Sequence, residues 1–135
     1  MMNSKLFKAN TGALKEIRNF LSAFLIEKNI EKSLIEKIIL AAGEAAMNIV
    51  QHSYNGKNDN EIIRTEIYLN NQELEIHFFD KGKPVVPKNI KPRNLEEIKP
   101  GGLGTFFIGE IMDAVEWKSE SKDWTNHLIL KKKIK

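Results

Sequence analysis

The segment Glu44-Ala-Ala-Met-Asn48-Ile-Val-Gln-His52-Ser-Tyr54 places three polar side chains at helical spacing within an apolar run. Glu44 and Asn48 are about one helical turn apart and therefore point the same way, with His52 one turn further along the same face. A carboxylate and an amide on one stripe can hold a metal ion or a water molecule between them. A single histidine on a helix is more often structural, so we assign His52 no catalytic role.

Two shorter motifs follow this helix in a fixed order. Asp80-Lys-Gly82 stands at the end of a predicted strand, and residues 101–104, Gly-Gly-Leu-Gly, open a predicted helix. Backbone N–H groups at the start of a helix favour phosphate, because the helix dipole and the unsatisfied donors both attract an anion. Each motif alone is a weak signal, but the three in this order predict a nucleotide site.

Length and composition limit what can surround that site. A chain of 135 residues that is 41% hydrophobic predicts one domain, residues 1–135, with a single packed core. No apolar run approaches the roughly 20 residues that span a bilayer, and the first residues lack the apolar segment of a signal peptide. We therefore expect a cytoplasmic protein without membrane contact. The absence of cysteine excludes disulfides, thiolate catalysis and cysteine-ligated zinc.

The net charge of +3 raises the question of nucleic-acid binding, so the positions of the basic residues matter. Residues 131–135 form a basic tail that is typical of a solvated strand end. A second group lies in a proline-containing segment, residues 81–101: Lys81, Lys83, Lys88, Lys91, Arg93 and Lys99. This segment is either a basic lid that closes over polyphosphate or an ordinary solvated loop. Neither group predicts direct contact with nucleic acid.

Two amphipathic helices are predicted in the first half of the chain. The first spans residues 13–28 and is capped by Asn10 or Thr11. Its apolar side chains recur at helical spacing: Leu14, Ile17, Leu21, Phe24 and Leu25. The second, longer helix spans residues 31–52 and carries Glu44 in its middle. The apolar faces of both helices are expected to pack on the core.

From Glu61 the apolar pattern changes to a period of two, which predicts a β-hairpin with Asn70-Asn71 at its turn. The inward side chains are Ile63, Thr65, Ile67 and Leu69 on one strand and Leu74, Ile76 and Phe78 on the next. Asp80 continues this inward face, where a carboxylate needs a partner. That partner is either a backbone turn, since Asp-x-Gly is a common turn sequence, or a ligand donor such as an exocyclic amine.

The remaining pattern completes the layout. A third helix is predicted over residues 103–113, and three further strands over residues 4–9, 114–118 and 125–132. Together these elements predict an α/β layout in which helices cover one face of a mixed or antiparallel sheet.

These residues resemble a known family. The segment 44–54, Asp80-Lys-Gly-Lys-Pro84, Gly102-Leu-Gly-Thr-Phe-Phe-Ile108 and Ile111-Met-Asp113 are similar to the N-box, adenine box and glycine box of the Bergerat-fold, histidine-kinase-like ATPases. Among these ATPases the chain resembles the anti-sigma factor serine kinases of the RsbW and SpoIIAB type, which are stand-alone ATPase domains. The resemblance covers nearly the whole chain. It implies an α+β two-layer sandwich with a mixed, mainly antiparallel sheet and helices on one face.

The resemblance also implies a role for each motif. Glu44 would be the general base that deprotonates a serine hydroxyl, and Asn48 would ligate the magnesium that bridges the phosphates of ATP. Asp80 would accept a hydrogen bond from the adenine amino group, and Gly82 would let the base approach the backbone. The phosphate contacts would come from four residues at the start of the third helix: Gly102, Leu103, Gly104 and Thr105.

The implied function is an enzyme that uses ATP and magnesium. It would sequester a sigma factor and phosphorylate a serine of an anti-sigma-factor antagonist, and it would be a homodimer. The alternative is a module that binds nucleotide and partner without transferring phosphate. Glu44 favours the enzyme, because a pure binding module does not need that carboxylate. A histidine-kinase fragment is disfavoured, because the sequence has no dimerisation helix with a phosphoacceptor histidine.

The chain departs from the family pattern at two places. Gly82-Lys83-Pro84 stands where many relatives have a second glycine, which bears on the hinge of the lid. Trp124-Thr125-Asn126 replaces the Gly-Thr common in the last strand. The polar residue that supports Asp80 is therefore either Thr125 or Asn126.

Overall fold

The computed structural model describes residues 2–53, 57–82, 102–119 and 123–134. The strands are β1 (Met2–Asn10), β2 (Lys57–Asn70), β3 (Glu73–Asp80), β4 (Ala114–Ser119) and β5 (Asn126–Lys133). The helices are α1 (Ala13–Glu27), α2 (Lys32–Asn48) and α3 (Gly102–Ile111), with a π-helical turn, η1 (Ile49–Ser53), directly after α2.

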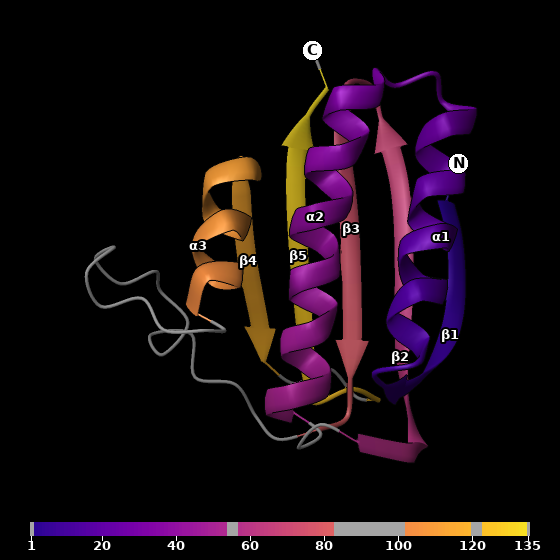
Figure 1. Cartoon of the computed structure of the whole chain (residues 1–135), viewed down its shortest axis with the longest axis vertical. Coiled ribbons are helices and arrows are strands. Elements are labelled where there is room, and N and C mark those ends of the chain that lie inside the picture. Colours follow the sequence, from indigo (N-terminus) through magenta and orange to yellow (C-terminus); the bar gives the residue numbers. More distant parts are fainter. Residues whose placement is uncertain (1, 54–56, 83–101, 120–122, 135) are drawn as a thin grey trace.

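The five strands form one antiparallel sheet in the order β1-β2-β3-β5-β4. The three α-helices lie on the same face of this sheet (Figure 1). The α+β two-layer arrangement is therefore confirmed, and every strand pairing in the described chain is antiparallel. The other face carries no described helix. The proposed lid, residues 81–101, lies outside the described residues from residue 83 onward.

The β2–β3 hairpin follows the period of two in the sequence. Ile63 and Ile67 of β2, and Ile76 and Phe78 of β3, are fully buried beneath the helices. The predicted turn is wrong by one residue, because β2 continues through Asn70, which pairs with Glu73. The turn residues are instead 71 and 72, and the backbone of Asn71 adopts a φ of 59°. Asparagine tolerates this left-handed conformation better than most residues do.

The first two helices lie close to their predicted positions. Asn10, not Thr11, caps α1, since its Oδ1 accepts a hydrogen bond from the backbone N–H of Ala13 at 2.9 Å. The second helix is regular only to Asn48. There the backbone N–H of Ile49 is shared between the carbonyls of Ala45 and Ala46, and the π-helical turn begins. The side chain of His52, within that turn, lies outside the described atoms.

The last strand lies inside the sheet, between β3 and β4. β5 pairs with β3 along its whole length, and β4 takes the outer edge beyond β5. The basic tail, which the sequence analysis interpreted as a solvated strand end, begins in the last residues of β5. There Lys131 pairs with Glu116 at 3.1 Å and Lys132 with Asp113 at 3.4 Å. In the described ranges, no helix is both long enough and apolar enough to cross a bilayer.

Candidate functional site

Glu44 and Asn48 lie on the C-terminal half of α2, as the helical spacing predicts. Both side chains are partly buried, and the residues around them are small and buried: Ala41, Ala42, Ala45 and Ala46. Within the described ranges, no hydrogen bond or ion pair involves the Glu44 side chain. Its carboxylate is therefore available to an incoming group.

A glycine beside Glu44 brings the neighbouring helix close. A Cβ atom on Gly43 would lie 2.6 Å from Nε of Arg18, so the Arg18 side chain crosses α2 where only a hydrogen atom fits. Glycine in a helix interior costs about 1 kcal/mol relative to alanine. Any larger residue at position 43 would therefore require the Arg18 side chain to move.

Asp80 is the most constrained side chain of the site. It is only 1% exposed, at the end of β3. Its Oδ1 accepts hydrogen bonds from the backbone N–H of Gly82 at 3.0 Å and from Nδ2 of Asn126 at 2.9 Å. The Gly82 contact confirms the turn interpretation of Asp-x-Gly. A carboxylate can accept about four hydrogen bonds, so these two donors leave it capacity to bind a ligand donor.

The choice between Thr125 and Asn126 is now resolved. Asn126 lies directly opposite Asp80 in the β3–β5 register, is 4% exposed, and supports the carboxylate through its side chain. Thr125 contributes its backbone, whose N–H donates to the carbonyl of Asp80 at 2.9 Å. Since a carboxylate only accepts hydrogen bonds, the Asn126 amide must present its nitrogen to Asp80.

The glycine run opens α3, as predicted. The helix begins at Gly102, so the backbone N–H groups of its first turn, residues 102–105, are those that an anion would meet. Ile108 and Met112 are buried and anchor the helix, which also packs against α2. Gly101 and the side chains of residues 102–106 lie outside the described atoms. The roles of Leu103, Gly104 and Thr105 therefore stay predictions.

The three motifs share one end of the fold. The C-terminal end of α2, the end of β3 and the start of α3 all face the same end of the sheet (Figure 1). The amide oxygen of Asn48 is a ligand type that magnesium accepts. No group of three or more His, Asp or Glu side chains in the described part of the chain could hold a metal ion. A magnesium ion here would rely on Asn48, phosphate oxygens and water, which is common for this metal.

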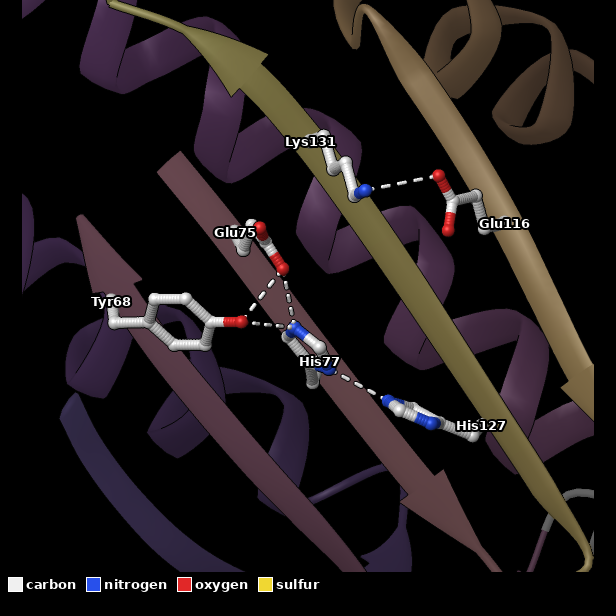
Figure 2. Close-up of polar contacts among 6 residues, drawn as sticks. All are labelled: Tyr68, Glu75, His77, Glu116, His127 and Lys131. Atoms are coloured by element: carbon white, nitrogen blue, oxygen red, sulfur yellow. Dashed lines mark hydrogen bonds and ion pairs between the residues drawn. The ribbon is translucent and has the colours of Figure 1, made fainter. Parts of the chain in front are cut away.

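A polar network lies on the sheet face away from the helices (Figure 2). Oε1 of Glu75 accepts a hydrogen bond from the hydroxyl of Tyr68 at 2.7 Å and contacts Nε2 of His77 at 2.9 Å. Nδ1 of His77 lies 2.6 Å from Nε2 of His127, so one ring must donate and the other accept. Burial and the bond to Glu75 raise the pKa of Tyr68 to about 12. Burial alone would raise the pKa of Glu75, but hydrogen bonds from Tyr68 and His77 lower it.

Aromatic rings extend this network toward the end of β3. Phe79 stacks on His127 with 4.0 Å between ring centroids, and Trp124 contacts Phe79 at 5.9 Å. Nζ of Lys81 lies 5.2 Å from the centre of the Trp124 ring. The sequence analysis did not identify this group. Alternation along β3 is the signal that could have placed Phe79 and Lys81 opposite Asp80.

His127 makes the stability of the fold depend on pH. Burial, followed by the neighbouring His77 and Lys118, lowers the pKa of His127 to about 4, against the opposing effect of Glu66. In the unfolded chain the imidazole of His127 takes up a proton near pH 6.5, but in the folded protein it does so only near pH 4. Protonation therefore favours the unfolded state, and the free energy of unfolding should fall as the pH drops from about 6.5 to about 4. We expect a loss of about 1 to 2 kcal/mol, discounted because the ring is partly exposed.

Urea unfolding of wild type and His127→Phe at pH 7.5 and 4.5 measures this effect. Phenylalanine keeps the stack on Phe79 but cannot titrate, so the difference between the two proteins reports the titration of His127 together with its contact to His77. An equal loss of stability on acidification in both proteins would contradict the assignment.

Comparisons with known proteins agree with this geometry. A family model described as the histidine kinase-like ATPase domain matches residues 7–132. Serine-protein kinase RsbW of Staphylococcus aureus (strain MRSA252) is 33% identical over 95 residues, which cover 64% of this chain and 60% of that protein. Serine-protein kinase RsbW of Halalkalibacterium halodurans is 30% identical over 95 residues, 64% of this chain and 57% of that protein. The chain thus spans about 60% of the length of these curated relatives.

A solved structure shares the fold. The crystal structure of the RsbU and RsbW domains of Rv1364c from Mycobacterium tuberculosis superposes with a TM-score of 0.72 at 16% sequence identity. The match covers 99% of this chain and 32% of that one. At this identity the likeness establishes the architecture and not the activity.

Proposed function

This chain belongs to the histidine kinase-like ATPase family, and from that membership we propose that it is an ATP-dependent protein serine kinase that regulates a sigma factor. The similarity to the RsbW serine-protein kinases supports the reaction class. The observation that carries the proposal is the partly exposed carboxylate of Glu44, one helical turn before Asn48, at the end of the fold where β3 places Asp80.

The substrate ATP would be held by three parts of the site. Asp80, fixed by Gly82 and Asn126, would accept from the adenine amino group. The first turn of α3 would present backbone N–H groups to the phosphates. Asn48 would ligate the magnesium ion, which neutralises phosphate charge when bound.

Glu44 would act on the protein substrate. Its carboxylate accepts the proton of a serine hydroxyl, and the serine oxygen attacks the γ-phosphorus of ATP. A new P–O bond forms to serine, the bond between the γ-phosphorus and the β,γ-bridging oxygen breaks, and ADP leaves. Phosphoserine and ADP are the products.

The partners follow from the same proposal. The phosphorylated protein would be an anti-sigma-factor antagonist. A kinase that is not bound to the antagonist would sequester a sigma factor in the cytoplasm. We also propose a homodimer. Its support is the family resemblance together with the sheet face that no described helix covers. Light scattering of the purified protein measures the dimer directly.

The decisive experiment is a transfer assay with radiolabelled ATP. The substrate is a candidate antagonist domain, sought among the products of neighbouring genes, and a Ser→Ala variant of that domain is the control. The wild-type kinase should label the native domain and leave the control unlabelled. Binding of ATP and of the domain without any label would instead favour the non-catalytic module.

Partner exchange should depend on phosphorylation. A phosphoserine adds a charge of about −1.5 to −2 beside Glu44, so the product should bind at least about tenfold more weakly than the substrate. Pull-downs with unmodified and phosphorylated antagonist, in ATP and in ADP, measure this difference and the competing capture of the sigma factor. Equal capture of both antagonist forms in both nucleotides would mean that no switch operates.

A further inference from the structure

The ends of β3 and β5 are joined on both faces of the sheet. On the helix face, the Asn126 side chain donates to the carboxylate of Asp80, and within the plane of the sheet the Thr125 N–H donates to the carbonyl of Asp80, both at 2.9 Å. On the opposite face, Lys81 lies over the ring of Trp124, and Trp124 contacts Phe79. Both sets of contacts involve adjacent residues of the same two chain segments.

The contacts on the two faces of the sheet are connected through the backbone. Phe79, in β3, and Lys81, directly after it, flank Asp80 in the chain, and Trp124 immediately precedes Thr125 and Asn126. A shift of residue 124 away from Lys81 would therefore move the N–H of Thr125 and the amide of Asn126 that hold Asp80. Cation–π contacts and aromatic pairs are each strong enough to favour the arrangement in which residue 124 stays beside Lys81 over one in which it has moved away.

We propose that Trp124 and Lys81 are positioning residues for base recognition, acting through Asp80 from the opposite face of the sheet. This inference rests on the proposed function, in which Asp80 reads adenine. Without the outer contacts, the arrangement of Asp80 that accepts the adenine amine is populated only part of the time. The apparent affinity for adenine nucleotides is then the intrinsic affinity multiplied by the fraction of molecules in that arrangement.

The test compares ATP with inosine triphosphate, which carries an oxygen in place of the 6-amino group. Calorimetry should show ATP affinity about five- to tenfold lower than wild type for Trp124→Leu, which loses both contacts, and about two- to fivefold lower for Lys81→Met, which loses one. Inosine triphosphate affinity should stay within about twofold, because the triphosphate contacts lie on α2 and α3. Loss of preference for ATP is the signature of a positioning role.

A matched control removes the same kind of contact elsewhere. Lys28 lies in the connection between α1 and α2, and its Nζ is 5.3 Å from the ring centre of Phe24 in α1. That connection is at the opposite end of the sheet from the end of β3 (Figure 1). Lys28→Met should bind both nucleotides like wild type. Should the tryptophan variant fail to fold, the exposed Lys81 still provides the test.

Three results would overturn the inference. An equal fall for both nucleotides would indicate general damage or a direct phosphate contact of Lys81. Unchanged ATP preference in both variants would show that Asp80 is positioned without Trp124 and Lys81. If the wild-type protein bound ATP and inosine triphosphate with equal affinity, Asp80 would not recognise the adenine amine. The inference about Trp124 and Lys81 would then be wrong as well.

Discussion

Replacing Glu44 with glutamine should slow serine phosphorylation by about 10²-fold or more, while ATP affinity stays within about twofold of wild type. Glutamine keeps the shape of the side chain but cannot take the proton of the attacking hydroxyl. In the proposed mechanism the site loses its general base and keeps its nucleotide contacts, which would come from Asp80, Asn48 and the start of α3. Single-turnover transfer with radiolabelled ATP gives the rate, and calorimetry gives the affinity.

Glu36→Gln is the matched control for this experiment. Glu36 is an exposed carboxylate on the same helix, two turns before Glu44. Its replacement removes one negative charge from α2 without touching the site, and phosphorylation should be unchanged. Transfer at the wild-type rate by Glu44→Gln would show that another group accepts the proton.

Replacing Asp80 with asparagine should weaken ATP binding by about 10- to 100-fold, which corresponds to one charge-assisted hydrogen bond. The variant should still fold, since an amide oxygen can accept from Gly82 and Asn126 as the carboxylate oxygen does. The variant loses the negative charge that, in the proposed site, would favour the adenine amine. Calorimetry with ATP and GTP in magnesium measures the effect.

Asp123→Asn provides the comparison, because Asp123 is an exposed carboxylate shortly before β5. It should bind ATP like wild type. Two observations would contradict the adenine pocket: wild-type affinity in Asp80→Asn, or equal affinity of the wild-type protein for ATP and GTP.

Much of the fold was predictable because its apolar pattern is local. The alternation through Ile63 and Ile67 and then Ile76 and Phe78 predicted the central hairpin, and all four side chains are buried. The same alternation put Asp80 on the helix face, where it lies. Helical spacing likewise predicted α1 and most of α2. These features depend on neighbours within a few residues, which the sequence displays directly.

Other features depend on contacts that sequence spacing does not display. The choice of Asn126 over Thr125 follows from the register of β5 against β3, which pairs residues 46 positions apart. The π-helical turn after Asn48 changes the offset of His52, and an α-helical period could not anticipate it. The contacts of His77 with His127 and of Lys81 with Trp124 likewise require two strands to be aligned first.

The interior position of β5, between β3 and β4, has a consequence for how the chain folds during synthesis. The hairpin of β2 and β3 can form from neighbouring residues, but Asp80 acquires Asn126 only when a strand from much later in the sequence joins the sheet. Pairings between distant segments form slowly, because the loop between them must close first. On a ribosome, Asp80 is therefore synthesised well before the strand that orients it. The hydrogen bond that orients Asp80 is gained late in folding, and a nascent chain that lacks β5 lacks this form of the site.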